Sequence, residues 1–212
     1  MDKSLDPDKN IIEKSLKYEG EWLEFKTISL QTPSSKIIKN YEFVERSSKK
    51  KHNPNQDGVT IIPLVTYPTT KARKLIIEAN FRPPMNAFVL EFPGGLVESD
   101  SGIEDALREL KEETGYIGKR ILADSFKFPT VYFDPWKSTE STKVIIIEVD
   151  GEDERNQNPM QSLDETEEIK VFLVDFDKDL IKNLEELGEK YNFKMSSELY
   201  SFALGIALYT FF

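Results

Sequence analysis

The sequence predicts an α+β fold in which a mixed β-sheet carries helices and is preceded by a small N-terminal β annex. Three observations support this prediction. Short apolar runs bounded by turn residues dominate the first half of the chain, and such runs are typical of strands. One segment with helical spacing of its apolar residues, 103–115, interrupts them, and two more helical segments close the chain. A length of 212 residues allows one ample core or a main domain with a small annex.

The N-terminal part is expected to be small and rich in strands. Residues 1–17 are polar, and their composition indicates partial disorder. Strand-like runs at 22–30 and 36–46, separated by the turn-rich sequence TPSS, predict a hairpin within an annex of residues 18–55. The polar stretch SSKKKHNPNQDG then has the composition of a linker, so the main domain is expected over residues 56–212.

The main domain is expected to mix strands and helices around one long loop. The segment from Gly151 to Glu168 has almost no apolar periodicity and predicts that loop. Loops of this length in compact domains are usually functional or disordered. The expected elements are strands at 59–67, 74–81 and 88–92, a helix at 103–115, strands at 121–133, 144–149 and 169–174, and helices at 178–191 and 197–209.

The first of these helices carries a stack of acids. Residues four apart are neighbours on a helix, so Asp105, Glu109 and Glu113 form a column of like charges, which destabilises by about 0.2–0.5 kcal/mol per pair. Gly115 is expected to end the helix, and acids in a last turn oppose the helix dipole. A divalent cation would stabilise the column, because Mg²⁺ prefers oxygen ligands and bridges carboxylates to phosphates. The alternative is a solvated acidic face, which charge runs usually indicate.

The surroundings of the acid column favour the cation site. A second column comprises Glu104, Arg108 and Glu112, and its arginine can neutralise the carboxylates one turn before and one turn after it. Ser101 with Glu104 predicts a capping box at the helix start, and a strand with a glycine turn, AFVLEFPGGL, comes just before it. If the face holds a cation, then neutralising Glu112 or Glu113 should stabilise the metal-free protein. The apolar stripe opposite the acids comprises Ile103, Leu107 and Leu110.

The stretch from Gly94 to Tyr116 resembles the Nudix box. The family pattern is glycine, five residues, glutamate, seven residues and then Arg-Glu-apolar-x-Glu-Glu-x-Gly-apolar, and it is highly specific. Asp100 replaces the first glutamate, and Tyr116 replaces the last aliphatic residue. Relatives that carry EFPAGL align their first glycine with Gly95, which leaves this chain one residue shorter between turn and helix. The matching residues are Gly94, Arg108, Glu109, Leu110, Glu112, Glu113 and Gly115.

Within that superfamily the chain resembles the ADP-ribose pyrophosphatases, the branch that hydrolyses ADP-sugars. The resemblance extends from about residue 21 to residue 208 and rests on the motifs GEWLEF, YEFVER, DGVTIIPL, NFRPPM, EFPGGL, FDP and YSFALGIAL. It implies a Nudix-type α/β/α sandwich with a mixed sheet. It also implies a homodimer and a Mg²⁺ cofactor, with Mn²⁺ as a substitute.

The resemblance assigns the metal ligands to the acidic helix. Glu109, Glu112 and Glu113 would hold the cation together with the main-chain carbonyl of Gly94, and Glu112 also counts among the catalytic residues. The three acids fall within about 100° of one helix face, so they can share metal ions. Glycine serves at position 94 as well as the alanine of relatives, because only the backbone is used.

A general base is expected from the long late loop. Hydrolysis of a pyrophosphate needs cations to neutralise the phosphates and a carboxylate to orient or deprotonate water. By resemblance this carboxylate lies just before the strand that resumes the core, where Glu167 is the best match. Glu165 and Glu168 are the alternatives, since a small slip of alignment would exchange them.

Aromatic side chains are expected to bind the adenine, because flat rings stack on a base. By resemblance Trp22 and Tyr41 occupy the positions of two stacking tryptophans, one from each subunit of an intertwined dimer, and Tyr41 departs from the pattern. The alternative is ordinary packing on a core. Trp136 stands where relatives have glycine, and it would wall the pocket, add a stacking surface or pack on the surface. The other residues assigned to the substrate are Glu42, Arg46, Arg82, Leu96 and Asp134.

Composition argues against several other classes of function. The chain has no cysteine, which excludes thiolate chemistry and fits a reducing compartment, so a cytoplasmic location is expected and a nuclear one stays open. The single histidine, His52, lies in a polar run, so imidazole catalysis is not expected. A net charge of −10 argues against nucleic-acid binding. Neither a signal peptide nor a membrane span is expected, because the longest apolar run is too short.

Three functions therefore compete. The leading one is Mg²⁺-dependent hydrolysis of ADP-ribose to AMP and ribose 5-phosphate. The second is the same chemistry on another nucleoside diphosphate sugar, such as ADP-glucose or GDP-mannose. The third is a catalytically idle Nudix module that binds ADP-ribose or a protein partner. The acid column argues against the third, because a binding module would gain stability by losing it.

Overall fold

The computed structural model describes residues 10–47, 52–121 and 129–209. The chain divides into two compact units. The annex unit comprises Met1–Asp57 with Thr130–Thr142, and the main unit comprises Gly58–Pro129 with Lys143–Phe212. Residues 1–9, part of the predicted linker and the middle of the predicted strand 121–133 lie outside the described residues.

The annex unit is built on a three-stranded antiparallel sheet in the order β1-β2-β3. Its strands are β1 (Ile11–Glu19), β2 (Leu23–Gln31) and β3 (Ile37–Arg46), and the short strand β9 (Thr130–Tyr132) belongs to the same unit. The hairpin formed by β2 and β3 lies within one residue of the predicted runs at both ends. The partial disorder predicted for residues 1–17 is wrong for 11–17, which form β1.

The strand β1 was missed because β-bulges break its sequence period. The pairing of β1 with β2 shifts register twice, between Ile11 and Glu13 and between Leu16 and Tyr18. Each shift moves the following side chains to the other face of the strand, so apolar and polar residues do not alternate strictly.

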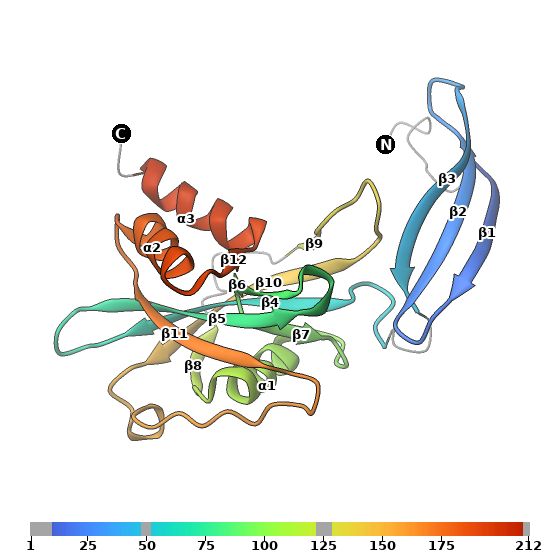
Figure 1. Ribbon diagram of the computed structural model, residues 1–212. Coiled ribbons are helices and arrows are strands. Elements are labelled where there is room, and N and C mark those ends of the chain that lie inside the picture. Colours follow the sequence, from blue (N-terminus) through green and yellow to red (C-terminus); the bar gives the residue numbers. More distant parts are fainter. Residues whose placement is uncertain (1–9, 48–51, 122–128, 210–212) are drawn as a thin grey trace. The chain divides into compact units, whose positions relative to one another are not determined.

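The main unit contains a mixed sheet centred on β5 (Arg73–Arg82; Figure 1). Strand β11 (Ile169–Asp175) pairs with one edge of β5 in antiparallel register from Ile169↔Asn80 to Asp175↔Lys74. The other edge of β5 is shared by two strands: β4 (Gly58–Thr66) pairs with the first residues of β5, and β6 (Ala87–Glu91) pairs with its last residues. Strand β12 (Lys194–Met195) runs parallel to its neighbour, β6. The short strand β7 (Gly94–Leu96) pairs with the start of β4.

Helices cover both faces of this sheet, as an α/β/α sandwich requires (Figure 1). On one face Ala106 and Leu110 of α1 (Ile103–Thr114) pack with Ile61, Ile76 and Ile145 of the strands. On the other face Leu184 of α2 (Leu180–Tyr191) and Leu199 and Ala203 of α3 (Ser197–Tyr209) pack with Leu75 and Ile77. The side chains of alternate β5 residues therefore pack in the cores on opposite faces of the sheet. The predicted fold class is confirmed.

Apart from the predicted strand 121–133, whose middle lies outside the described residues, the predicted elements of the main unit correspond to observed ones, and α3 has the predicted bounds. The predicted stripe of α1 needs one change: Leu107 is partly exposed, and Ala106 is buried in its place. Within the described residues no helix is long and apolar enough to cross a membrane. The elements are β4 (Gly58–Thr66), β5 (Arg73–Arg82), a 3₁₀ turn (Pro83–Met85), β6 (Ala87–Glu91), β7 (Gly94–Leu96), α1 (Ile103–Thr114), β8 (Gly118–Ile121), β10 (Ser141–Asp150, from the annex unit), a 3₁₀ turn (Glu154–Asn156), β11 (Ile169–Asp175), α2 (Leu180–Tyr191), β12 (Lys194–Met195) and α3 (Ser197–Tyr209).

Candidate active site

The glycine turn before α1 is held tightly against β4. Gly94 lies opposite Thr60, and Leu96 lies opposite Gly58. A Cβ atom at Gly94 would overlap the carbonyl oxygen of Val59, so a side chain there would push β7 away from β4. The sequence predicted that glycine serves at this position as well as alanine does. The structure adds that this chain requires the glycine.

Two of the predicted metal ligands converge on the same turn. The Glu113 carboxylate is buried, and its Oε2 accepts a hydrogen bond from the Gly94 N–H at 2.9 Å. A Cβ atom at Gly95 would overlap the carboxylate of Glu109, so this acid lies directly against the backbone of the turn. Two carboxylates are thus gathered where the helix passes the glycines, and carboxylate oxygens are ligands that hard cations prefer.

Arg108 neutralises acids of both helical columns. It contacts Glu112 at 2.8 Å, as predicted, but it also contacts Glu109 at 2.9 Å and Asp105 at 3.7 Å. The prediction that the Asp105 column is uncompensated is therefore wrong in part. Among the described residues, no three acidic or histidine side chains are grouped as a ready metal site.

The start of α1 also differs from the prediction. The N-cap is Gly102, with a φ of 74° and no side-chain cap bond, so the Ser101 capping box is wrong. Instead the Asp105 carboxylate reaches back and accepts bonds from the backbone N–H groups of Glu98 (3.2 Å) and Ser99 (3.0 Å). Burial would raise the pKa of Asp105, but these bonds outweigh it and lower the pKa. Asp105 thus holds the loop before the helix.

Burial disfavours the charged forms of Glu109 and Glu113, the two acids at the glycine turn. It raises the pKa of Glu109 to about 7 despite Arg108, and it raises the pKa of Glu113 to about 8 despite the bond from Gly94. The charge of Glu167 contributes to both shifts. Without a cation, these acids therefore hold protons near neutral pH, and a bound cation would displace them.

These shifts predict how metal-free stability depends on pH. A folded-state pKa above the unfolded value means that folding binds protons, so stability falls as pH rises from about 4.5 to about 8. Glu113→Gln should remove a large part of that fall, on the order of a few kcal/mol, because the amide still accepts from Gly94 but does not titrate. Denaturant unfolding in EDTA at pH 5, 7 and 9 measures this effect.

Glu112→Gln is the matched control for that experiment. Its side chain is 42% exposed and paired with Arg108, so its loss should lower stability slightly, by about 0.3–0.5 kcal/mol. From the structure we therefore expect Glu113→Gln, and not Glu112→Gln, to stabilise the metal-free protein. A Glu113→Gln protein that is less stable than the wild type at pH 9 would contradict this account of the acid cluster.

The late loop brings Glu167 to the acids of α1. The loop is fixed to the helix end, because Ser162 N–H donates to the Glu112 carbonyl at 2.8 Å and Gln161 donates to the Glu113 carbonyl at 2.5 Å. Glu167 closes a turn in which its carboxylate accepts from the Asp164 N–H at 2.9 Å. Unlike Glu165 and Glu168, which are exposed, Glu167 is half-buried and acts electrostatically on the helix acids.

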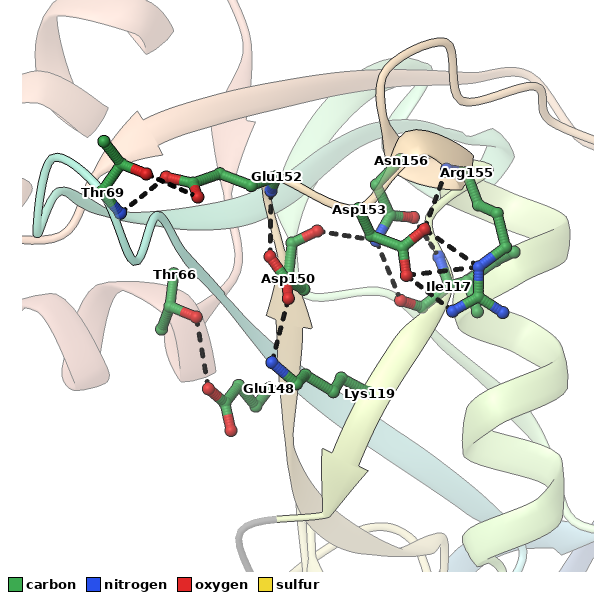
Figure 2. A network of polar contacts seen from close by, with 10 residues as sticks. All are labelled: Thr66, Thr69, Ile117, Lys119, Glu148, Asp150, Glu152, Asp153, Arg155 and Asn156. Atoms are coloured by element: carbon green, nitrogen blue, oxygen red, sulfur yellow. Dashed lines mark hydrogen bonds and ion pairs between the residues drawn. The ribbon is translucent and has the colours of Figure 1, made fainter.

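The first part of the late loop is held by a polar network (Figure 2). The buried Asn156 side chain accepts from the Ile117 N–H at 2.8 Å and donates to the carbonyls of Ile117 and Asp150. Asp150 pairs with Lys119, and Glu152 binds the backbone and hydroxyl of Thr69. The loop is therefore ordered by side chains that sequence periodicity does not reveal.

Arg82 lies at the end of β5 and is paired with a residue that the sequence analysis did not single out. Its Nε and Nη2 atoms lie 2.9 and 2.6 Å from Oε1 of Glu91, the acid of the EFPGGL motif. The Arg82 side chain is half exposed, and this contact leaves three of the five guanidinium N–H groups available to another acceptor. The alternation of Glu78, Asn80 and Arg82 along β5 was the signal that could have revealed this polar face.

Apart from Leu96 of β7, the remaining predicted substrate residues lie in the annex unit. Trp22 and Tyr41 are both exposed, at 50% and 42%, so neither is packed in a core. The Tyr41 hydroxyl donates to the carbonyl of Trp136, whose side chain is also exposed. The segment around Trp136 is fixed to β3 by backbone bonds between Val44 and both Lys137 and Thr139.

The charged substrate residues of the annex unit are mostly engaged in ion pairs. Arg46 pairs with Glu140, and Asp134 pairs with Lys137. Glu42 faces solvent on β3. The structure thus gathers the predicted residues into two sets, one on each unit: Trp22, Tyr41, Glu42, Arg46 and Asp134 on the annex unit, and Arg82, Gly94, Leu96, Glu109, Glu112, Glu113 and Glu167 on the main unit.

Comparison with known proteins agrees with this geometry. A family profile described as the NUDIX domain matches residues 58–192. The chain belongs to the Nudix family. Its Nudix box therefore comprises the glycine turn and α1 described above, and the profile also includes the loop with Glu167.

Several curated Nudix relatives match most of the chain. An ADP-sugar pyrophosphatase of Mus musculus is 31% identical over 202 residues, covering 94% of this chain and 88% of that protein. An ADP-ribose pyrophosphatase of Saccharomyces cerevisiae is 30% identical over 191 residues, covering 89% and 78%. A crystal structure of an ADP compounds hydrolase matches with a TM-score of 0.58 at 17% identity, covering 83% and 82%, and supports the Nudix fold.

Proposed function

We propose that this protein hydrolyses the pyrophosphate bond of ADP-ribose to give AMP and ribose 5-phosphate. The observation that carries the proposal is that Glu109 and Glu113 both lie against the glycine turn at Gly94 and Gly95, with the charge of Glu167 acting on both acids. The relatives named as ADP-ribose and ADP-sugar pyrophosphatases support the substrate class, because they match along nearly the whole chain.

A divalent cation fits this site, and Mg²⁺ is the proposed ion, with Mn²⁺ as a substitute. The donor set is all oxygen, and the glycine backbone lies so close to Glu109 that a side chain at Gly95 would fill the space. Glu109, Glu112, Glu113 and the Gly94 carbonyl would hold the ion. When bound, it would neutralise the charge of the diphosphate.

The other residues divide the remaining tasks. Glu167 accepts the proton of the water that attacks one phosphorus, as the new P–O bond forms and the P–O bond to the bridging oxygen breaks. Arg82 binds the diphosphate, because its guanidinium is always charged and keeps free N–H groups beside the bond to Glu91. Trp22 and Tyr41 stack on the adenine, and Glu42, Arg46, Leu96 and Asp134 hold the rest of the nucleotide.

A homodimer is part of this proposal. The annex sheet exposes large apolar side chains, which a second copy of the chain would cover. An intertwined pair would also supply the second stacking ring from the partner. The cysteine-free composition favours a reducing compartment, and we place the enzyme in the cytoplasm. The exposed apolar residues of the sheet include Ile11, Ile12, Leu16, Tyr18, Ile37 and Ile38.

A substrate panel tests the proposed function. The protein is incubated with Mg²⁺ and ADP-ribose, ADP-glucose or GDP-mannose in ¹⁸O-labelled water, and products are identified by mass spectrometry. We expect ADP-ribose to give the highest kcat/KM, with one labelled oxygen on a single product phosphate. A higher kcat/KM for another sugar nucleotide would identify that nucleotide as the substrate. If the protein binds these nucleotides but cleaves none of them, it is a catalytically idle module.

A further inference from the structure

The polar face of β5 continues from the α1 core to the end of the strand. Ile76 packs in the cluster under α1, so Glu78, Asn80 and Arg82, at alternate positions after it, lie on the same face. Glu91 of β6 lies directly opposite Glu78 in the β5–β6 register. Two carboxylates in such a position repel each other, and Arg82 supplies the cation that pairs with Glu91.

The Arg82–Glu91 contact uses only one edge of the guanidinium. The Nε and Nη2 atoms both approach Oε1 of Glu91, whose side chain is only 15% exposed. A guanidinium has five N–H groups in a fixed plane, so an acceptor on this edge determines where the remaining three point. The side chain of Arg82 is half exposed, so those groups are accessible to a ligand.

Another acid on this face lacks a partner for one of its oxygens. Glu78 is buried, with an exposed fraction of 1%, and its Oε2 atom has no hydrogen-bond partner. Without Glu91, the guanidinium would lose the acceptor that fixes this edge, and Arg82 would be free to turn toward the unbonded oxygen of Glu78.

We propose that Glu91 is a positioning residue that holds one edge of Arg82, keeps it from turning toward Glu78, and so presents its free N–H groups to a diphosphate. The inference rests on the proposed function in that it takes the ligand of Arg82 to be the diphosphate of the substrate. The role of Glu91 is indirect, because it acts only through Arg82.

A double-mutant cycle on diphosphate binding tests this role. Calorimetry measures the Kd of inorganic pyrophosphate, with Mg²⁺ present, for the wild type, Glu91→Ala, Arg82→Ala and the double variant. Each single substitution should raise the Kd by about tenfold, the usual effect of losing a charge-assisted bond. The double variant should bind no more weakly than Arg82→Ala, because Glu91 has no effect without its arginine.

Two further variants separate positioning from general damage. Glu91→Gln keeps an oxygen that can accept from both nitrogens, so it should recover part of the affinity, and it also serves if Glu91→Ala fails to fold. Asp175→Ala is the matched control, because it removes another ion pair of β5, the 2.6 Å contact with Lys74. It should leave the Kd unchanged.

The outcomes distinguish this proposal from the proposed function. A wild-type Kd retained in Glu91→Ala, an additive loss in the double variant, or no pyrophosphate binding by the wild type would overturn the role of Glu91. If the cycle behaves as expected but no nucleotide sugar is cleaved, the proposed function fails and the positioning role stands. For cleaved ADP-ribose, Glu91→Ala should raise KM more than it lowers kcat.

Discussion

Replacing Glu113 by glutamine is expected to abolish hydrolysis of ADP-ribose, with kcat lower by at least about 10²–10³-fold, the usual loss when a main electrostatic contact of a transition state is removed. The carboxylate is buried beside the glycine turn and faces the charge of Glu109 and Glu167. An amide keeps the bond to Gly94 but lacks the charge that a divalent cation needs. Steady-state kinetics at saturating Mg²⁺ measure the loss.

Two other substitutions on α1 sharpen this prediction. Glu112→Gln should also abolish activity, although it barely changes metal-free stability, because its carboxylate is proposed as a ligand. Glu104→Gln should leave kcat within about twofold, because Glu104 is exposed on the surface and is not one of the proposed ligands. Activity of Glu113→Gln above half of the wild-type value would contradict the assignment of the metal ligands.

Glu167→Gln is expected to lower kcat by about 10²–10⁴-fold, the range attributed to general acid–base catalysis. The amide oxygen can still accept from the Asp164 N–H, so the turn and the attached loop should keep their structure. Divalent-ion affinity should stay nearly unchanged, because the cation is assigned to the α1 acids and the Gly94 carbonyl. Parallel kinetics and calorimetry on one preparation separate the two effects.

The neighbouring glutamates are the controls for the loop base. Glu165→Gln and Glu168→Gln should retain near-normal kcat, because both side chains are exposed, whereas Glu167 is half-buried and its charge acts on the helix acids. An inactive Glu165 or Glu168 variant beside an active Glu167→Gln would transfer the role of base to that residue.

Much of the fold could be predicted because its strands and helices carry regular patterns. The helix α3 has its predicted bounds, and α1 ends at Gly115, whose φ of 76° suits glycine. The strand β1 could not be predicted, because bulges disturb its alternation. The start of α1 was misjudged, because the Asp105 carboxylate, and not Ser101, holds the preceding loop.

The candidate site could be predicted where a motif fixes local spacing, and not where it depends on strand pairing. The acids of α1 and the glycine turn are neighbours in sequence, so the Nudix resemblance identified them together. The partners of Arg82 depend on the register of β5 with β6, which places Glu91 opposite Glu78. Likewise the order of the late loop depends on Asn156 and on contacts with the end of α1.

Calorimetric titration of Mg²⁺ into the Glu167→Gln variant, with ADP-ribose present, tests the central claim that the acids of α1 exist to hold a divalent cation beside a diphosphate. The slow variant keeps the substrate intact during the titration. We expect binding that disappears when Glu113→Gln is added to the same background. Absence of Mg²⁺ binding in the Glu167→Gln variant, or binding that persists unchanged without the Glu113 carboxylate, would contradict the claim.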